Sequence, residues 1–260
     1  MITVFTPTYN RAKLLPDLYE SLKRQTCKDF EWVIVDDGST DDTESLVKQW
    51  IPQADFSICY TKKENGGKQR AVNLGVQKAK GEYFFIVDSD DILTDNAVET
   101  ALKWFDTIKD EKGFGGIGGQ KGYKNGKAIG ESFDGEYLDA TTLERSKYRI
   151  NGDKAEIFYT DVLKKFPFPE FEGEKFVPEA LVYNRIAQAG YKLRWFNEIV
   201  YLAEYLPDGY SANVDRLLIS NWQGYSLYVK ELMQSNGPLK AKLIPLAGYI
   251  MRIVKKGLKI

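Results

Sequence analysis

The chain has 260 residues, of which 43% are hydrophobic and 28% are charged, and this composition excludes a disordered, collagen-like or disulfide-scaffold protein. The 36 basic and 37 acidic residues leave a net charge of −1, so we expect no nucleic-acid partner. No histidine is present, which excludes Ser-His-Asp catalysis and histidine-ligated metal sites.

The two cysteines, Cys27 and Cys59, are too few for a zinc site made of cysteine alone. We expect both thiols to be free and buried, as in a reducing compartment. The first residues run directly into an apolar segment, so we expect no secretory signal and a cytoplasmic location. The longest apolar tract, 243–254, is too short to span a bilayer.

Strand and helix patterns alternate along the first hundred residues. Short β-rich runs predict strands at 2–6, 30–35, 56–61 and 83–87. Apolar residues at helical spacing predict helices at 13–25, 41–50, 71–81 and 95–108. Asp41 and Glu44 predict a capping box at the start of the second helix. The alternation predicts an α/β fold with a Rossmann-like, mostly parallel sheet flanked by helices.

The rest of the chain is less regular. The glycine-rich stretch 113–130 predicts strands joined by turns, and 178–190 predicts a helix with Pro178 in its first turn. The pattern is helical from residue 214 onward, with a break at 236–238. We therefore divide the chain into 1–110, 111–213 and 214–260.

Polar residues collect where the four predicted strands end, at 8–11, 36–39, 65–68 and 88–91. Ligands of parallel sheets bind at the carboxyl ends of the strands, so these residues should face one crevice. No Gly-x-Gly-x-x-Gly follows the first strand and no Walker A sequence occurs, which excludes the usual dinucleotide site and the P-loop.

Asp88 and Asp90 follow an apolar strand with one small residue between them. Oxygen donors of this kind suit Mg²⁺ or Mn²⁺ rather than zinc. Without histidine, the other ligands would be carboxylate, water or substrate phosphate, which points to a site completed by a nucleotide diphosphate. The alternative is a surface turn with a helix cap.

Two further strand ends offer groups to a nucleotide. One carboxylate of Asp36 and Asp37 can accept hydrogen bonds from a ribose or base, the alternative being a solvated turn. Gly66 and Gly67 allow the backbone to approach a phosphate, and Lys68 supplies positive charge.

Four segments together resemble a known family. They are Thr6-Pro7-Thr8-Tyr9-Asn10-Arg11, the stretch 30–41 with its Asp36-Asp37-Gly38-Ser39, Asn65-Gly66-Gly67-Lys68, and Asp88-Ser89-Asp90-Asp91. In this order they resemble a family 2 glycosyltransferase of the GT-A fold. The resemblance covers residues 1 to about 110 and is looser beyond them.

The resemblance implies that 1–110 binds a nucleotide-sugar donor, usually a UDP-sugar, and that 111–213 binds the acceptor. Pro7 and Tyr9 would hold the uracil, and Asp37 would read the base. Further donor contacts are implied at Arg11, Gly67, Lys68, Asp88 and Ser89.

The resemblance also implies a divalent ion. Asp90, with Asp88, would bind Mn²⁺ or Mg²⁺ bridging the diphosphate, and the ion would stabilise the leaving group as a Lewis acid. The family inverts the anomeric configuration by direct displacement, so a general base must take the proton of the acceptor hydroxyl.

The family usually places this base on a Glu-Asp pair at the start of a helix in the second half. Here Glu179 is followed by Ala180, so Glu179 is the expected base and Glu174 the reserve. The alternative is that Glu179 only stabilises a helix N-terminus. The Gln-x-x-Arg-Trp motif of processive synthases is absent, which favours addition of one sugar. Residues 205–213 resemble the family's mobile segment near the donor.

Residues 237–260 contain six Lys or Arg and no acidic residue. They predict a basic amphipathic segment that can lie on an anionic membrane surface. Many bacterial relatives extend sugars on a polyprenyl-diphosphate lipid, so the resemblance implies a capsule, cell-wall or lipid-linked glycan acceptor and peripheral attachment at the inner face of the cell membrane. The alternative is a helix packed on the body with a solvated lysine face.

Two other functions stay open. A catalytically inactive nucleotide-sugar-binding module is supported only by the alanine at position 180. A sugar-1-phosphate nucleotidyltransferase normally has a glycine-rich loop after its first strand, which residues 6–11 lack.

Overall fold

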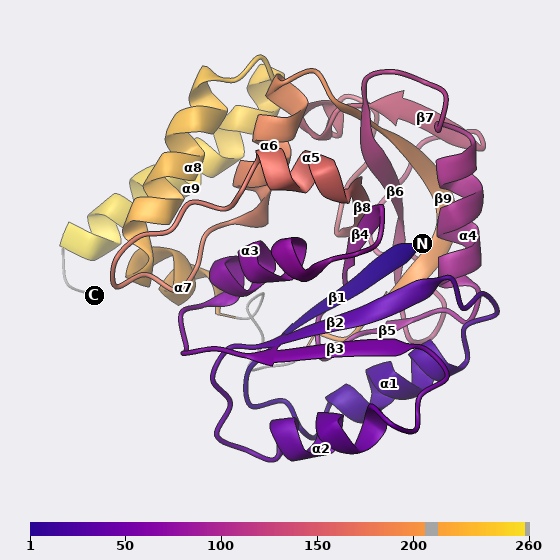
Figure 1. Ribbon diagram of the computed structural model, residues 1–260. Coiled ribbons are helices and arrows are strands. Elements are labelled where there is room, and N and C mark those ends of the chain that lie inside the picture. The colour runs from indigo at the N-terminus through magenta and orange to yellow at the C-terminus, as the bar shows by residue number, and fades with distance from the viewer. Residues whose placement is uncertain (206–212, 258–260) are drawn as a thin grey trace.

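The computed structural model describes residues 1–205 and 213–257, and its described strands form one mixed sheet. The strands are β1 (Ile2–Thr8), β2 (Phe30–Asp36), β3 (Ser57–Lys62), β4 (Tyr83–Ile86), β5 (Ile92–Leu93), β6 (Phe114–Tyr123), β7 (Tyr137–Ala140), β8 (Lys154–Tyr159) and β9 (Lys192–Ala203). Their order is β3-β2-β1-β4-β8-β6-β9-β5, and β7 pairs with β9 (Figure 1). The four strands predicted in the first half are confirmed.

Strands from both halves of the chain end at one edge of this sheet. β3, β2, β1 and β4 are parallel neighbours, which confirms the predicted parallel arrangement of the first half. β8 is antiparallel to both β4 and β6, so β6 runs in the same direction as β4, and β9 is parallel to β6. The carboxyl ends of β1, β2, β4, β6 and β9 therefore lie at the edge where β8 begins.

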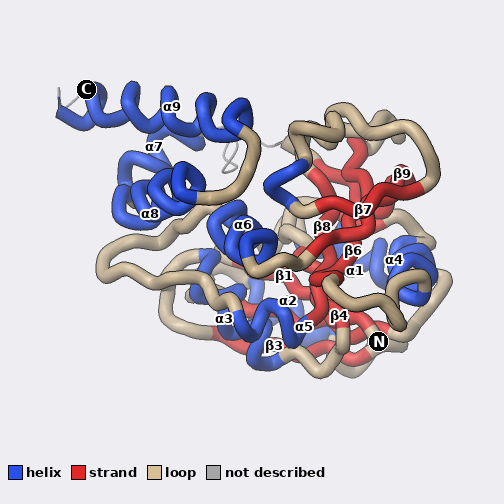
Figure 2. The backbone as a smooth tube through the Cα atoms, turned by 90° about the horizontal axis from the view of Figure 1, so that it is seen from above, coloured by secondary structure: helices blue, strands red, loops and turns tan. Residues whose placement is uncertain are grey.

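Helices cover both faces of the sheet (Figures 1 and 2). One face is covered by α1 (Leu15–Lys23), α2 (Thr43–Trp50) and α4 (Ala97–Asp106), the other by α3 (Lys68–Lys78), α5 (Thr160–Lys165) and α6 (Glu179–Gln188). Alternate strand residues supply the two cores: Val4 and Trp32 belong to the first, Phe5 and Val33 to the second. Because both faces are covered, these strands read as continuous apolar runs.

The glycine-rich stretch 113–130 forms one long strand, β6, and a turn back to a single bridge between Gly122 and Ala128. Two of its glycines are required by large side chains on β9. A Cβ at Gly118 would lie 2.4 Å from the Trp195 ring, and one at Gly119 would lie 2.7 Å from the Phe196 ring. Where strands joined by turns were predicted, the stretch thus contains one long strand, β6, followed by a turn.

The capping box predicted at Asp41 and Glu44 is wrong. Asp41 Oδ1 accepts the Thr43 N–H at 3.1 Å, but Glu44 pairs with Lys48 at 2.7 Å and with Lys62 at 3.1 Å. Two lysines within reach hold the Glu44 carboxylate away from the helix N-terminus. A capping box is present instead at the short 3₁₀ helix Thr142–Glu144, where Thr141 is the N-cap.

The C-terminal part consists of α7 (Val214–Ser220), α8 (Trp222–Gln234) and α9 (Leu239–Gly257), as predicted, with the break at 236–238. The three helices lie together at one side of the molecule (Figure 2). Tyr249 of α9 stacks on Trp222 of α8 with 4.9 Å between ring centroids. Of the helices in the described ranges, none combines the length and apolar content that a membrane span requires.

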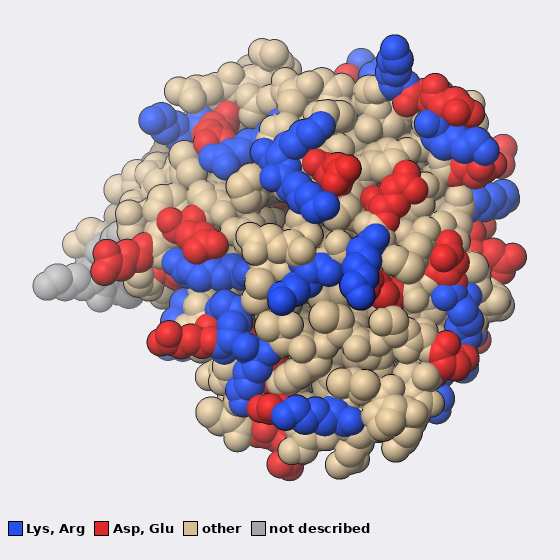
Figure 3. Space-filling model, in the orientation of Figure 1, with Lys and Arg blue, Asp and Glu red and all other residues tan. Residues whose placement is uncertain are grey.

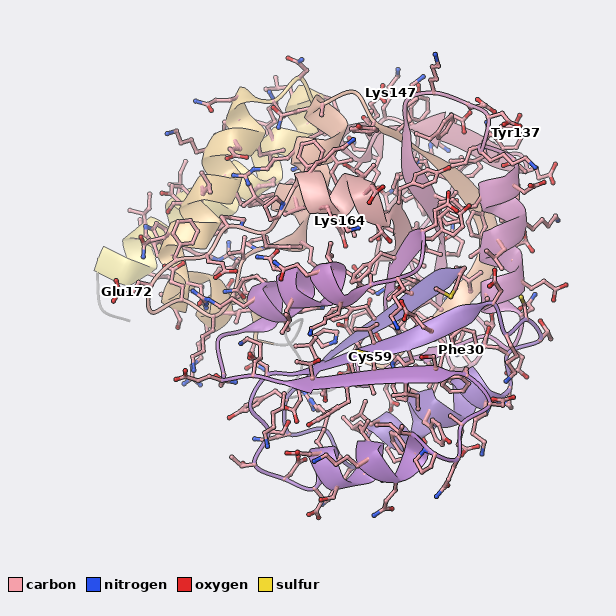
Figure 4. The ribbon with its side chains drawn as sticks, in the orientation of Figure 1. Phe30, Cys59, Tyr137, Lys147, Lys164 and Glu172 are labelled. Carbon is pink, nitrogen blue, oxygen red and sulfur yellow. The ribbon has the colours of Figure 1, made fainter. Side chains whose placement is uncertain are left out.

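Both cysteines are free, as predicted, but each is half-buried rather than buried. Cys59 lies on β3, next to the strand that Phe30 begins (Figure 4). β3 is at the edge of the sheet, so its side chains are less covered than those of the central strands.

The surface carries charges of both signs. On the face shown in Figure 3, Lys and Arg side chains are interspersed with Asp and Glu. Surface ion pairs of the molecule include Lys48 with Glu44 and Lys109 with Asp106. Neither sign of charge predominates on this face, in agreement with the net charge of −1.

Candidate active site

A cavity of about 240 Å³ opens at the edge where the parallel strands end. Eight residues predicted from the sequence line it: Pro7, Tyr9, Arg11, Asp37, Lys68, Asp88, Ser89 and Asp90. The strand ends that were predicted to face one crevice are thus brought together. Gly67, Glu174 and Glu179 are not among the lining residues.

The loops after β1 and β2 form one wall of the cavity. Asn10, at φ 54°, donates its N–H to Ser39 Oγ at 2.8 Å, and its Oδ1 accepts the Thr40 N–H at 2.8 Å. The Ala12 N–H donates to Asp41 at 3.0 Å. These bonds fix the first loop against the second, while the Tyr9 ring remains 48% exposed at the cavity rim.

The Thr8 side chain carries a buried polar group of this wall that lacks a hydrogen-bond partner among the described residues. Thr8 is 3% exposed and lines the cavity, and the group is its hydroxyl. Buried hydroxyls are nearly always hydrogen-bonded. The Thr8 hydroxyl is therefore a position at which a bound ligand can supply the missing partner.

Asp37 holds the loop that precedes α3. Its Oδ1 accepts from Lys63 Nζ at 2.7 Å and from the Gly66 N–H at 2.9 Å. Its Oδ2 accepts from the Gly67 N–H at 2.7 Å and from the Asn65 side chain at 3.1 Å. A carboxylate has about four acceptor positions, so all are used. Reading a base with this carboxylate requires one of these bonds to be released.

Gly67 is needed for the path of the backbone. Its φ is 96°, and a Cβ at this position would lie 2.0 Å from the Lys175 carbonyl oxygen. Any side chain would therefore clash with the segment before α6. The absence of a side chain at Gly67 therefore allows the start of α3 to lie against this segment.

The carboxylates after β4, those of Asp88, Asp90 and Asp91, line the cavity. Burial, and then the charge of Asp88, raises the pKa of Asp90. The same two causes raise the pKa of Asp91 to about 6, although Tyr201 donates to its carboxylate at 2.6 Å. In the described part of the chain, no three His, Cys, Asp or Glu side chains converge as a metal site. A cation held here would take further oxygen ligands from water or from a substrate.

Lys68 joins this carboxylate group to the second half of the chain. Its Nζ lies 2.6 Å from Asp88 Oδ1 and 2.9 Å from Glu179 Oε1. Burial alone lowers the pKa of Lys68, but the charges of Asp88 and Glu179 outweigh it and the pKa is raised. Lys68 in turn holds the pKa of Asp88 below its ordinary value against the effect of burial. The ammonium therefore keeps its proton and fixes both carboxylates.

Glu174 binds the N-terminus of α8 and does not line the cavity. It is buried, and its two oxygens accept the N–H groups of Gln223 and Gly224 at 2.6 and 2.9 Å. These residues lie in the first turn of α8, where N–H groups lack helical partners and a negative charge is favourable. Asn221, the residue before α8, also contacts this segment, because its Oδ1 accepts the Lys175 N–H at 2.7 Å. Glu174 thus fastens the segment before α6 to α8.

Several lining residues were not predicted from the sequence. They are Lys121, Asp153, Ala203 and Glu204, whereas Thr8 and Asp91 belong to the predicted strand ends 8–11 and 88–91, and Tyr205 begins the segment 205–213 that was expected near the donor. Lys121 and Asp153 belong to no local motif, and only the order of β4, β8 and β6 brings them to this edge. Tyr205 donates to Asp153 at 2.6 Å. Residues 206–212 of the expected mobile segment lie outside the described residues.

The motifs, their position at the strand ends and this cavity agree with one family, and a family model described as Glycosyl transferase family 2 matches residues 3–157. The chain belongs to glycosyl transferase family 2. Membership of this family argues against the nucleotidyltransferase alternative.

Curated relatives of this family 2 domain match between about two fifths and most of its length. Glycosyltransferase GlyG of Streptococcus pneumoniae serotype 4 is 39% identical over 100 residues, which is 38% of this chain and 33% of GlyG. The minor teichoic acid biosynthesis protein GgaB of Bacillus subtilis is 27% identical over 230 residues, which is 86% of this chain and 25% of GgaB. The matches thus span a third or less of these two relatives.

Solved structures share the fold of this family 2 domain. S. aureus TarS 1–349 in complex with UDP-GlcNAc has a TM-score of 0.71 at 23% identity, covering 96% of this chain and 72% of that one. The mannosyltransferase PcManGT from Pyrobaculum calidifontis, in complex with GDP-Man and Mn²⁺, has a TM-score of 0.62 at 20% identity, covering 98% and 69%. These likenesses confirm the predicted GT-A fold.

Proposed function

We propose that this domain moves one sugar from a UDP-sugar to a hydroxyl of a glycan or lipid-linked acceptor, with inversion at the anomeric carbon. The observation that carries the proposal is the Lys68 bridge, because it places Glu179 beside the carboxylates at the strand ends. The complexes of TarS with UDP-GlcNAc and of PcManGT with GDP-Man support a nucleotide-sugar donor.

The nucleoside would lie against the wall formed by the loops after β1 and β2. The exposed face of Tyr9 suits stacking with a base, and Pro7 lines the same cavity from the end of β1. The unpartnered Thr8 hydroxyl would bond to the nucleoside. Asp37 and Gly67 would position the loop at 65–67 against the nucleotide. Arg11 and Ser89, which line the cavity, would contact the nucleotide directly.

Asp90 and Asp88 would hold a divalent ion, Mn²⁺ or Mg²⁺. The donor set fits such an ion, because both ligands are carboxylates and Asp90 forms no ion pair with a described residue. When bound together with the donor diphosphate, the ion supplies Lewis-acid stabilisation of the leaving group. The PcManGT complex with Mn²⁺ supports this choice.

Glu179 would be the general base. It is the first residue of α6 and its Oε1 contacts Lys68 beside the cavity, whereas both oxygens of Glu174 already accept N–H groups of α8. In the displacement, the acceptor oxygen bonds to the anomeric carbon as the bond to the diphosphate breaks. The proton of the acceptor hydroxyl passes to Glu179.

The acceptor would be a growing polymer of the cell surface, such as a cell-wall or capsular glycan. GgaB, named for minor teichoic acid biosynthesis, matches this chain over 86% of its length and supports that choice. A polyprenyl-linked acceptor would present its hydroxyl at a membrane surface.

Residues 237–260 would bind an anionic membrane surface. α9 packs one face on α7 and α8, where Arg252 and Lys255 pair with Asp215. Its other face is apolar and exposed: Leu239, Leu243, Ile244, Ile250, Met251 and Val254 are each at least 52% exposed. The packing on α7 and α8 agrees with the alternative of a helix packed on the body, but the exposed residues of α9 include many apolar side chains as well as lysines. An exposed apolar face on a segment that contains no acidic residue suits the boundary layer of an anionic bilayer.

Turnover of the donor tests this function. Purified protein would be incubated with UDP-GlcNAc, other UDP-sugars and Mn²⁺, with and without isolated cell-wall glycan, and UDP release measured. We expect release that the acceptor accelerates and that Glu179→Gln reduces by at least about 100-fold. Binding of UDP without release from any UDP-sugar would instead support the inactive-module alternative.

A further inference from the structure

Lys121 of β6 is a cavity cation that the sequence motifs do not include. It pairs in register with Tyr201 of β9, and its ammonium lies 3.8 Å from the centre of the Tyr201 ring. It lines the cavity. Unlike Lys68, it forms no ion pair with any residue within the described ranges. Its charge is therefore available to an anion that enters the cavity.

The Tyr201 ring, which lies against the Lys121 ammonium, is itself held in place. The Tyr201 hydroxyl donates to Asp91 at 2.6 Å and accepts the Asp88 N–H at 3.0 Å, so the ring cannot turn away. A cation over a fixed aromatic face is held by the ring quadrupole. The Lys121 charge also contributes, after Lys68, to the lowered pKa of Asp88. The ammonium thus lies close to the carboxylates after β4.

The order of the strands places Lys121 along the donor. Across the sheet, the cavity is lined first by Asp37 after β2, then by Tyr9 after β1, then by Asp88 after β4, and then by Lys121 on β6 beyond β8. A donor with its base at Tyr9 and its first phosphate near Asp88 would bring its second phosphate toward β6. Lys121 would therefore lie beyond the first phosphate, at a position that a nucleoside monophosphate would not reach.

We infer that Lys121 binds the second phosphate of the donor and of the UDP product. The inference rests on the proposed function, since it assumes a nucleoside diphosphate group in this cavity. The ammonium would pair with an oxygen of that phosphate and neutralise the charge that builds up as the bond to the sugar breaks. The cavity would thereby distinguish diphosphates from monophosphates.

Calorimetric titration of UDP and of UMP, both with Mg²⁺, tests the inference on the whole chain. Lys121→Met removes the charge and keeps the stem, and Lys121→Arg keeps the charge. Lys127→Met is the matched control, because Lys127 is exposed on the turn after β6 and does not line the cavity. We expect Lys121→Met to weaken UDP binding at least about tenfold and to leave UMP binding unchanged. Lys121→Arg should retain most of the UDP affinity.

Unchanged UDP affinity in Lys121→Met would overturn the inference, and so would equal weakening of UDP and UMP. Retained UMP binding shows that the variant is folded. If the wild-type protein bound neither nucleotide, the proposed function itself would fail and this inference with it. The two failures are therefore distinguished by the wild-type titration.

Discussion

Lys68 and Glu179 form an ion pair with 2.9 Å between Nζ and Oε1. Lys68 begins α3 and Glu179 begins α6, so the pair connects the first turns of two helices from different halves of the chain. The same ammonium also holds Asp88. One side chain therefore sets the position of a donor-side carboxylate relative to the proposed base.

Lys68→Met should destabilise the fold. The substitution leaves the carboxylates of Asp88 and Glu179 without their cation in a partly buried site, and we expect a loss of about 1–3 kcal/mol in the free energy of unfolding. Urea denaturation measures it. Adding Glu179→Gln to Lys68→Met should cost less than the two single changes summed, because it removes one unpaired charge. Strictly additive costs would argue against the pair.

Glu179→Gln and Glu174→Gln should separate catalysis from stability. Glu179→Gln removes the proposed base, so UDP release should fall at least about 100-fold while UDP binding persists. Glu174→Gln weakens the charged cap of α8, so the free energy of unfolding should fall by about 1–2 kcal/mol. Activity assays and denaturation on both variants measure this. Loss of turnover in the folded Glu174→Gln variant, with full turnover in Glu179→Gln, would reverse the assignment.

The sequence predicts the parts of the site that are local to one strand end. Tyr9, Asp37 and Asp88 each follow a strand directly, and parallel pairing alone brings them together. Lys121 could not be predicted, because its place depends on β8 lying antiparallel between β4 and β6.

Local signals are incomplete where another residue competes for a side chain. Glu44 has the spacing of a capping box, yet its carboxylate pairs with Lys48 one helical turn along and with Lys62 of β3. Glu174 was the reserve base, and both its oxygens accept N–H groups of α8. Lys62 and the N-terminus of α8 are tertiary neighbours that the local pattern does not contain.

Lys154 should make stability depend on pH. It is 3% exposed and donates to the Ile129 carbonyl oxygen at 3.0 Å, and burial, then Arg145, lowers its pKa to about 8. An unfolded lysine titrates near pH 10.4, roughly two units higher. The folded state thus loses the proton first, and the free energy of unfolding should rise with pH from about 8 to about 10.

Denaturation of wild type and Lys154→Met at both ends of this window isolates the effect of Lys154. The stability of the wild type relative to the variant should rise by about 1–2 kcal/mol between pH 8 and pH 10, since methionine does not titrate. Parallel curves for the two proteins would show that Lys154 titrates as in the unfolded chain.

The exposed face of α9 should bind anionic vesicles. Ile244 and Ile250 are 76% and 54% exposed, and their insertion into a bilayer would bury both side chains. Ile244→Glu with Ile250→Glu should reduce co-sedimentation with phosphatidylglycerol vesicles at least about tenfold. Ile51→Glu is the control, because Ile51 is 43% exposed at the end of α2. Equal sedimentation of all three proteins would contradict a membrane contact through α9.

The most direct measurement is the titration of UDP into wild type and Asp90→Ala, each with Mn²⁺ and with EDTA. We expect the wild type to bind UDP with Mn²⁺ and to bind it far more weakly with EDTA, and Asp90→Ala to lose the metal-dependent part of the affinity. UDP binding that neither EDTA nor Asp90→Ala changes would contradict a metal-assisted donor site at the end of β4.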